Sequence, residues 1–419
     1  GKNYHIPLET EPMDYKGRFE ELMTKLSQQE KVVILIDEYD KPIIDFIGEP
    51  VALENRKVLK NFYETMKGCD PYIKFVFLTG VSKFSRVSVF SGLNNLTDIT
   101  LNKKWASLAG YTQDELSHYF KDYLEAMAQE LGVDTHTLSQ KIKEWYNGYS
   151  WDGKTFLYNP YSILSLLAEK TFRNFWFATG TPTFLLKLIQ EYDVNIEDLE
   201  QYETDESCFE SYDIDQMQVE SLLFQTGYLT VKTLQQTSFE RQEYVLSYPN
   251  LEVKESLLKH ILRDYSSSRR NVGIIINRLV RYLNAHQLEE WIQEIKSLFA
   301  SIPSHIFIKD KEAYYHTIIY LILTLIGVQI EAEVNTHTGR IDAVIQTSTH
   351  VYLFEFKLGT AEKALEQIED KHYYENYLPL RKEIVLVGVG FNIQEKNINS
   401  YGTFIIFFSS YKKISHSIV

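Results

Sequence analysis

The part of the sequence that most restricts the fold runs from Gly339 to Lys357 and reads GRIDAVIQTSTHVYLFEFK. Side chains alternate between the two faces of a β-strand. Glu355 and Lys357 therefore share one face, while Phe354 and Phe356 point into apolar packing on the other. Burying two charges on one face of an apolar strand is costly unless they have partners. The sequence predicts that this strand carries a functional site.

Asp342 lies on the preceding predicted strand, and a hairpin through residues 346–350 can bring its carboxylate beside Glu355. Two neighbouring carboxylates repel each other unless a divalent cation joins them, and oxygen ligands suit Mg²⁺ or Mn²⁺. The ammonium group of Lys357 could then act on a water molecule or stabilise charge that develops on a phosphate. The alternative is a surface hairpin with a weak ion pair between Glu355 and Lys357.

Two predicted helices add polar groups to this region. The helix expected at 361–377 carries Gln367 and Lys371 four positions apart, hence on one face, with Tyr374 nearby. The helix expected at 310–326 carries Glu312 and His316 at the same spacing. For the histidine, a packed or solvated position is preferred over a substrate contact.

The order and spacing of these residues resemble the PD-(D/E)XK nuclease superfamily. The resemblance implies that Asp342 and Glu355 are metal ligands for Mg²⁺ or Mn²⁺ and that Lys357 is the catalytic lysine. It implies further that Gln367 is the polar residue of the following helix and that Glu312 is an acidic residue of the first helix. No proline stands directly before Asp342. The aspartate follows Gly-Arg-Ile instead, which is a variant of the motif.

A second group of acids follows an apolar run near the N-terminus, in the segment VVILIDEYDKP at residues 32–42. Ligands bind at the carboxyl ends of strands in parallel α/β sheets, so these acids indicate a Walker B motif. Asp37 would then belong to the Mg²⁺ shell, and Glu38 would polarise the attacking water. A second predicted strand ends at Thr79, which would lie beside Asp37 if the two strands are neighbours. An acidic turn after a core strand is the alternative.

Several separated segments resemble the bacterial AAA-ATPase-like family, whose members carry a C-terminal PD-(D/E)XK nuclease domain. They are ILIDEYDKPI, the run FVFLTGVSKFSRVSVFSGLNNLTDITL, WYNGYSWDG with LYNPYSIL, and YPNLEVKESL. The resemblance implies that the complete protein binds ATP and Mg²⁺. The chain contains no G-x-x-x-x-G-K-[ST] phosphate loop, so we expect that loop upstream of Gly1 and ATPase activity only in a complete chain.

The sequence therefore predicts an α/β plus α protein. Residues 1–110 would be the C-terminal part of a P-loop-type ATPase core, and residues 111–265 a helical middle region with a winged-helix-like hairpin near its end. Residues 271–300 would form connecting helices. Residues 301–419 would form a restriction-endonuclease-like α/β domain.

Charge and composition limit the partners and the cellular compartment that we expect. The net charge is −14, and residues 191–220 contribute twelve acids without a Lys or Arg. A solvated acidic face explains that segment better than a basic partner does, and the rest of the chain, at −2, is compatible with nucleic acid. Cys69 and Cys208 provide no disulfide framework, so we expect a cytoplasmic protein. The longest apolar run, 317–328, is shorter than a membrane helix, so we expect no membrane contact.

The function predicted from the sequence is a metal-dependent nuclease that hydrolyses phosphodiesters and is coupled to an AAA-type ATP-binding module. We expect nucleic acid as the partner, with DNA favoured over RNA, and an oligomer formed through the ATPase module. The alternative is a nucleotide-switched interaction protein or nucleic-acid-binding protein with an inactive nuclease fold, in mobile-element or phage defence. Asp342, Glu355 and Lys357 occurring together favours the enzyme.

Overall fold

The structure is a computed structural model, and it describes most of the chain. It does not describe residues 1–5, 12, 47–48, 82–95, 177–184, 187, 190–191, 193, 210–217, 237–241, 267–270, 303–310, 328–330, 335–341, 393, 407–412 and 417–419. The side chains of 236, 266, 311–314, 331–334 and 413–416 are also outside the description. The chain divides into two compact units: Gly1–Phe172 with Thr181–Val194 and Leu199–Asn250, and Arg173–Gly180 with Asn195–Asp198 and Leu251–Val419.

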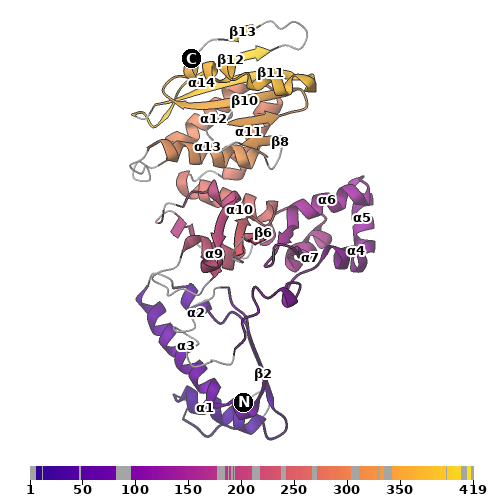
Figure 1. Cartoon of the computed structure of the whole chain (residues 1–419), viewed down its shortest axis with the longest axis vertical. Helices are drawn as coiled ribbons and strands as arrows, with labels where there is room; N and C mark the ends of the chain where they lie inside the picture. The colour runs from indigo at the N-terminus through magenta and orange to yellow at the C-terminus, as the bar shows by residue number, and fades with distance from the viewer. Residues whose placement is uncertain are drawn as a thin grey trace. The chain divides into compact units, whose positions relative to one another are not determined.

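The N-terminal part of the first unit contains β1 (Val32–Ile36) and β2 (Ile73–Leu78), which pair in parallel. Helices α1 (Tyr15–Leu26) and α3 (Pro50–Gly68) pack against each other beside this pair (Figure 1). The short helix α2 (Lys41–Ile44) follows the acidic turn after β1. Their apolar stripes and the inward side chains of the strands form a small core.

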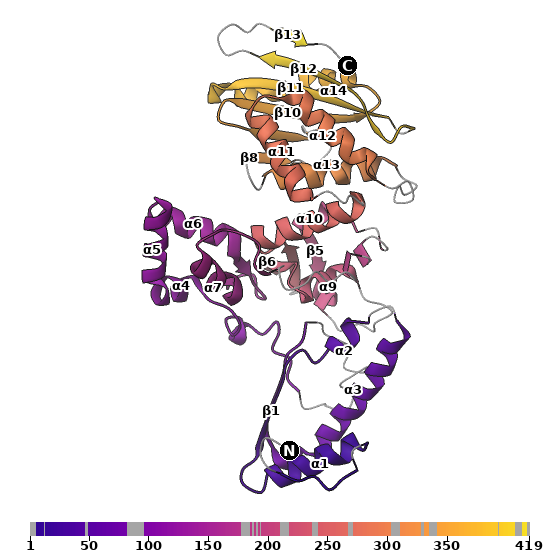
Figure 2. The same cartoon turned by 180° about the vertical axis from the view of Figure 1, so that it is seen from behind.

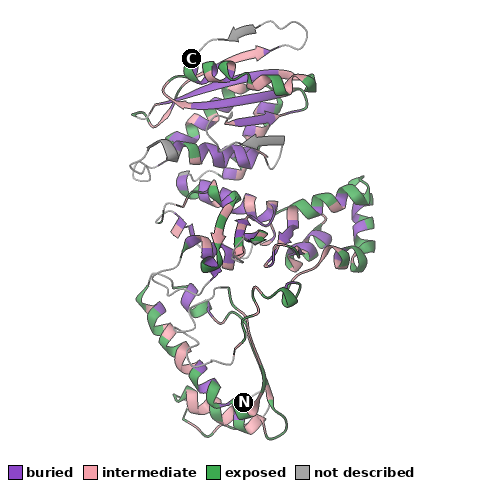
Figure 3. Cartoon of the chain, viewed as in Figure 1, coloured by how far each residue is buried: buried purple, intermediate pink, exposed green. Residues whose placement is uncertain are grey.

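One face of the β1–β2 pair is exposed. Ile34 and Ile36 pack into the core beneath the helices, whereas Val33 is 51% exposed, Leu35 71% and Phe75 54%. Figure 3 shows the pair in the colours of exposed and intermediate residues. Short apolar runs such as these are typical of buried parallel strands, but this face of the pair is exposed. The core cluster lies on one side of the pair, where α1 and α3 supply the apolar contacts.

The rest of the first unit is mainly helical, with short strands. The hairpin predicted near the end of the helical middle region corresponds to β6 and β7, which pair antiparallel. A strand that was not predicted, β5 from the acidic segment, pairs with the other side of β7. The elements are η3 (Lys103–Trp105), α4 (Gln113–Tyr119), α5 (Lys121–Leu131), α6 (Thr135–Tyr146), β3 (Asn147–Tyr149), β4 (Leu157–Tyr158), α7 (Pro160–Glu169), η5 (Asp198–Glu200), β5 (Tyr202–Asp205), η6 (Glu206–Phe209), α9 (Val219–Gln225), β6 (Thr230–Gln236) and β7 (Gln242–Ser247).

The second unit is built on a mixed sheet with strand order β13-β12-β11-β10-β9-β8 (Figures 1 and 2). The parallel neighbours β10 and β11 are connected through α14, and the other neighbours are antiparallel. The elements are α10 (Leu251–Ser266), α11 (Val272–Asn284), α12 (Leu288–Ala300), α13 (Lys311–Gly327), β8 (Glu331–Val334), β9 (Ala343–Gln346), β10 (His350–Leu358), α14 (Ala361–Asp370), η8 (Tyr373–Leu380), β11 (Glu383–Asn392), β12 (Asn397–Ile406) and β13 (Lys413–His416).

The two faces of β10 pack against different helices. On one face, the Tyr352 hydroxyl donates to the Leu283 carbonyl of α11 at 2.9 Å, and the Phe354 ring lies 4.8 Å from the Trp291 ring of α12. Because side chains alternate along a strand, the odd-numbered residues of β10 face the other way. These residues face α14.

The α14 face of the sheet has its own core. Val351 and Leu353 of β10 pack there with Leu365 and Ile368 of α14. Since Glu355 and Lys357 continue the same alternation, the two charged residues lie at the end of this apolar face.

Helix α14 ends earlier than the sequence predicts. The expected helix covers 361–377, but the structure ends it at Asp370, and His372 then adopts a left-handed φ of 52°. A left-handed residue cannot continue a right-handed helix, so the chain turns and resumes as the 3-10 helix η8. Most of the predicted Ser-rich linker, 267–270, lies outside the described residues.

Candidate active site

Strand pairing places the predicted acidic residues next to each other. In the antiparallel β9–β10 pair, Ala343 lies opposite Phe354, so Asp342 falls opposite Glu355. Residues that lie opposite each other share a face of the sheet. The backbone N–H of Asp342 is also close enough to the Glu355 carboxyl to lower its pKa. The hairpin between β9 and β10 thus brings together two acids that are thirteen positions apart in the sequence.

The Glu355 carboxylate has two unlike oxygens. Its Oε1 accepts a hydrogen bond from Gln367 Nε2 and lies 3.2 Å from Lys357 Nζ. Its Oε2 is buried and has no hydrogen-bond partner in the described part of the chain. The Oδ2 atom of Asp342 accepts from the backbone N–H of Phe356 at 2.7 Å. Both donor side chains therefore hold one oxygen of Glu355 and leave the other available.

Burial makes the two carboxyl groups hard to ionise. Glu355 is 1% exposed, and burial, followed by repulsion from Asp342, raises its pKa to about 7 against the pull of Lys357. Burial also raises the pKa of Asp342, while the Phe356 N–H, His316 and Lys357 oppose the rise. A buried acid whose charge is destabilised by a half-buried acid beside it forms a site that a cation would stabilise.

The donor set fits a hard divalent ion. Glu355 Oε2 is a buried oxygen without a partner, and the neighbouring carboxylate of Asp342 supplies further oxygen atoms of the kind that Mg²⁺ and Mn²⁺ prefer. Within the described residues, no group of three or more His, Cys, Asp or Glu side chains is arranged to hold a metal. This pair would therefore provide part of the coordination shell, and Mg²⁺ in proteins commonly keeps several waters.

Two glycines allow α14 to approach the sheet closely enough for Gln367 to reach Glu355. Gly388 lies opposite Glu355 on β11, and a Cβ atom there would meet the Ala361 carbonyl oxygen at 2.5 Å. A Cβ at Gly390 would meet the Gly359 carbonyl oxygen at 2.7 Å. The absence of side chains at these positions sets the height of α14 above the site.

The remaining residues predicted for this site have different placements. Glu312 lies in α13, but its side chain is outside the described residues. His316 is exposed and close enough to Asp342 to affect its ionisation. The hydroxyl of Tyr374, predicted to lie on the Gln367 side, instead contacts Nδ1 of His372 at 3.2 Å.

Sequence reasoning missed Tyr373. Burial raises the pKa of the Tyr373 hydroxyl, and Glu355, Gln367, Asp342 and Lys357 are all close enough to affect its ionisation. Helical spacing from Gln367 cannot predict this position, because α14 ends at Asp370 and His372 adopts a left-handed φ.

The N-terminal acids form a second cluster. Thr79 Oγ1 donates to Asp37 Oδ1 at 2.5 Å, and Ile36 lies opposite Leu78 in the parallel pair. Glu38 has a left-handed φ of 50°, and its carboxylate lies 3.8 Å from Lys41 Nζ. The structure therefore brings Thr79 beside Asp37 and directs Glu38 toward a lysine.

Sequence reasoning also passed over Asp40. Its carboxylate is fully buried and accepts from the backbone N–H of Val81 at 3.2 Å, whereas the Asp37 side chain is accessible. Asp40, the third acid of the DEYD segment, thus also ties the loop after β2 to the turn after β1.

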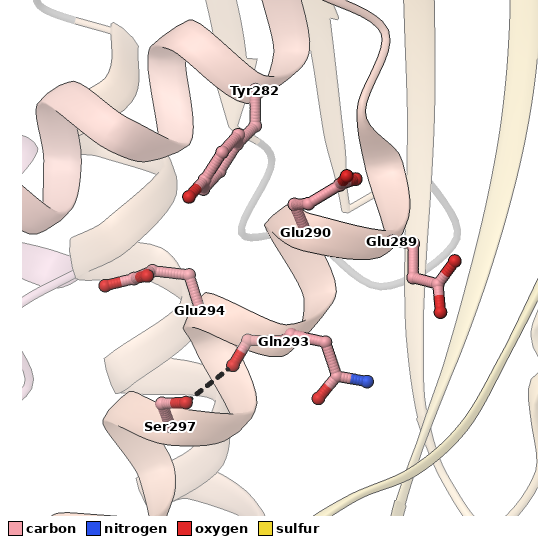
Figure 4. Close-up of a pocket in the computed structure, with 6 residues that line it drawn as sticks. All are labelled: Tyr282, Glu289, Glu290, Gln293, Glu294 and Ser297. Atoms are coloured by element: carbon pink, nitrogen blue, oxygen red, sulfur yellow. Dashed lines mark hydrogen bonds between the residues drawn. The ribbon is translucent and has the colours of Figure 1, made fainter.

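A separate pocket of about 400 Å³ lies on α11 and α12, lined by Tyr282, Glu289, Glu290, Gln293, Glu294 and Ser297 (Figure 4). These helices cover the face of the sheet opposite to α14. Its carboxylates would repel a phosphate backbone. The pocket is therefore not the site at which Asp342 and Glu355 act.

Comparison with known proteins follows the same division of the chain. Residues 2–90 match a family described as "Predicted AAA-ATPase", and residues 310–401 match one described as "PD-(D/E)XK nuclease superfamily". The chain belongs to the AAA-ATPase-like family that carries a C-terminal PD-(D/E)XK nuclease domain, which confirms the resemblance seen in the sequence.

A relative extends the similarity over most of the chain. It is the "Uncharacterized protein in vnfD 5'region" of Azotobacter chroococcum mcd 1, which is 37% identical over 393 residues, or 91% of this chain and 74% of the relative. No solved structure gives a significant match. Among the described residues, no helix has the length and apolar character that crossing a membrane requires.

Proposed function

We propose that this protein is a metal-dependent nuclease that hydrolyses phosphodiester bonds at the Asp342–Glu355 site. The observation that carries the proposal is the buried, unpartnered Oε2 of Glu355 beside Asp342, with Lys357 fixed on the other carboxylate oxygen. A structural ion pair between Glu355 and Lys357 would not require a second acid opposite Glu355, since the charge of Asp342 raises the pKa of Glu355.

Each residue has a distinct role in the proposed reaction. A divalent ion held by Asp342 and Glu355 would supply Lewis-acid activation of the phosphodiester and of the attacking water. Lys357, anchored at 3.2 Å from Glu355 Oε1, presents its ammonium group at the mouth of the site, where it stabilises negative charge that develops on the phosphate. Gln367 orients the Glu355 carboxylate.

The proposal also covers the substrate and the coupling of cleavage to the N-terminal module. Nucleic acid follows from the nuclease domain, and we favour DNA over RNA. The N-terminal module would bind ATP and Mg²⁺ in a complete protein through Asp37, Glu38 and Thr79, and would gate or drive cleavage, with oligomers forming through that module. The contact between Thr79 and Asp37 supports this role, because it places a polar group at the carboxyl end of a neighbouring parallel strand.

The test is cleavage of single- and double-stranded DNA and RNA with Mg²⁺ or Mn²⁺. Asp342→Ala and Glu355→Ala should abolish metal-dependent cleavage. Lys357→Ala should slow it by roughly 100- to 1,000-fold while metal binding is retained, because that residue acts on developing charge. Glu366→Ala, which removes an exposed carboxylate of α14, is the matched control and should cleave as wild type does.

The nuclease proposal fails if Asp342→Ala cleaves as fast as wild type. It also fails if the wild-type protein, including a complete form supplied with ATP, cleaves none of the four substrates. In the second case, a nucleic-acid-binding protein with an inactive nuclease fold takes its place.

A further inference from the structure

Two histidine rings stack on each other at the start of β10. The ring of His286, from the turn between α11 and α12, lies 4.2 Å from the ring of His350, and the two planes differ by 11°. His286 is exposed, whereas the side chain of His350 is only 13% exposed. The stack therefore joins the α11–α12 turn to β10, five positions before Glu355 on that strand.

The hydrogen bonds of His286 determine which of its nitrogens carries a proton. The Tyr352 hydroxyl donates its single proton to the Leu283 carbonyl at 2.9 Å. Its oxygen, which lies 2.9 Å from His286 Nδ1, can then only accept from that nitrogen. Nδ1 therefore carries the proton when the His286 ring is neutral.

The contacts of His350 are also satisfied by a neutral ring. Its Nε2 lies 3.1 Å from Glu383 Oε2 of β11, and this nitrogen carries the proton because a carboxylate only accepts. Its Nδ1 lies 2.7 Å from the Thr349 hydroxyl, which can donate to it. One proton on each ring is therefore enough for all of these contacts.

The turn that carries His286 has a strained backbone. His286 adopts a left-handed φ of 56°, which persists in a residue other than glycine only when surrounding contacts hold it. The Tyr352 hydroxyl and the stack with His350 supply such contacts. Within the turn, the N–H of Ala285 donates to the Arg281 carbonyl at 3.0 Å. Loss of the stack would therefore favour opening of the turn.

A second proton on each ring would place two positive charges face to face about 4 Å apart. Glu383 lies against His350 and can offset one of these charges, while the neighbouring cation, Lys382, donates to the Thr347 carbonyl at 2.8 Å. Two charged rings would therefore repel each other across the stack.

The ionisation of His350 agrees with this geometry. Burial, followed by repulsion from His286, lowers the pKa of His350 from 6.5, and Glu383 opposes the change. The folded protein therefore favours the neutral ring. The resulting stabilisation is fully present above about pH 6.5 and is lost as the pH falls through the lower pKa of the folded state.

We propose that the stack of His286 and His350 is a pH-sensitive switch, which holds the α11–α12 turn on β10 while the rings are neutral and releases it when both are protonated. The switch involves neither Asp342 nor Glu355 and does not depend on the proposed nuclease function.

Hydrogen–deuterium exchange of the full chain at pH 7.5 and pH 5.0 tests the switch. The buffers contain EDTA, and the rates are corrected for the intrinsic pH dependence of exchange. Protection of the amides at 283–288 should fall roughly 5- to 10-fold at pH 5.0, as expected for repulsion between two charges about 4 Å apart in water. Protection of the β11 amides at 384–391 should stay within about two-fold, because only the turn is released.

Single substitutions remove one of the two charges. In His286→Gln, which keeps an amide donor for Tyr352, and in His350→Gln, the protection at 283–288 should be the same at both pH values within about two-fold. His136→Gln, which removes an exposed histidine of α6, is the control and should keep the wild-type response.

Three results would overturn the proposal. One is unchanged protection of the turn at pH 5.0 in wild type, and another is an equal loss of protection in the turn and in β11, which would indicate a general loss of stability. Both are measured on the wild-type chain and so do not depend on whether the variants fold. The third is a wild-type response that persists in His286→Gln or in His350→Gln.

Discussion

At the residue scale, the C-terminal site depends on Glu355, a carboxyl that is 1% exposed and whose pKa lies near 7 instead of at the ordinary 4.5. Between these two pH values the folded protein binds more protons than the unfolded chain. The free energy of unfolding therefore falls as the pH rises through this window. The stabilisation is fully present below about pH 4.5 and is lost above about pH 7.

Glu355→Gln should remove this pH dependence from the metal-free protein. The glutamine carries no charge at any pH, so the variant should gain stability relative to wild type as the pH rises from 5 to 8, by on the order of 3 kcal/mol. Urea unfolding at several pH values measures the difference. Glu366→Gln, an exposed change on α14, should keep the wild-type profile. A wild-type profile for Glu355→Gln would show that Glu355 is ionised throughout.

The sequence was sufficient to propose Asp342, Glu355, Lys357 and Gln367, and the structure brings these four together. Their spacing matches strand alternation and one helical face, which are regular and readable. Tyr373 could not be proposed, because its position depends on the left-handed backbone at His372. Nothing in helical periodicity encodes such a break.

At the element scale, the distance between α14 and the sheet is controlled by glycines of β11. The apolar run at the start of β11 is typical of a buried strand, but the sequence alone gives no reason for glycine at Gly388. The reason is the 2.5 Å approach of the Ala361 carbonyl oxygen to the position of a Cβ atom. Such a contact depends on how the helix docks, which no local pattern reports.

Gly388→Ala should displace α14 from the sheet. The added methyl would also lie 2.7 Å from Leu365 Cγ, so the helix must move, at a cost of about 1–3 kcal/mol in the free energy of unfolding. Cleavage should fall as well, since Gln367 moves with the helix. Urea unfolding and the cleavage assay measure the two effects. Gly68→Ala, where nothing lies within 4 Å, is the control, and equal behaviour of both variants would refute this packing account.

The edges of the sheet were less predictable than its centre. The strand predicted from the alternation around Glu355 is β10, which is buried on both sides. No pattern in the sequence marks the beginning of β12 at Asn397 or the presence of β13. The start of β12 is polar and pairs through its backbone with β11, so hydrophobic patterning does not reveal it.

At the scale of the whole molecule, the two clusters of acids differ in whether their carboxylate oxygens already have partners. The C-terminal cluster has an available buried oxygen, whereas Asp37 already accepts from Thr79, and Glu38 faces Lys41. The chain also has no phosphate-loop motif to hold the phosphates of ATP. The C-terminal acids thus leave a buried oxygen without a partner, whereas the N-terminal acids are engaged in a hydrogen bond and an ion pair.

This 419-residue chain should therefore bind ATP with Mg²⁺ weakly, with a Kd well above the micromolar range. Calorimetry is the measurement, and Asp37→Ala should change the signal little. Micromolar binding that disappears in Asp37→Ala would mean that the N-terminal cluster holds nucleotide without a phosphate loop. In a complete protein, Glu38→Gln should abolish ATP turnover and spare binding.

The site residues from Asp342 to Tyr373 come from one continuous stretch, whereas the strand that carries Gly388 follows later in the chain. Contacts between residues close in sequence need little loop-closure entropy, so β9, β10 and α14 can associate early. During synthesis this stretch leaves the ribosome before β11 does. We expect Glu355 to keep one side of its strand open to water until β11 pairs with β10 in parallel across the α14 crossover. The charged pair would then lose its water late, after the hairpin that aligns it has formed.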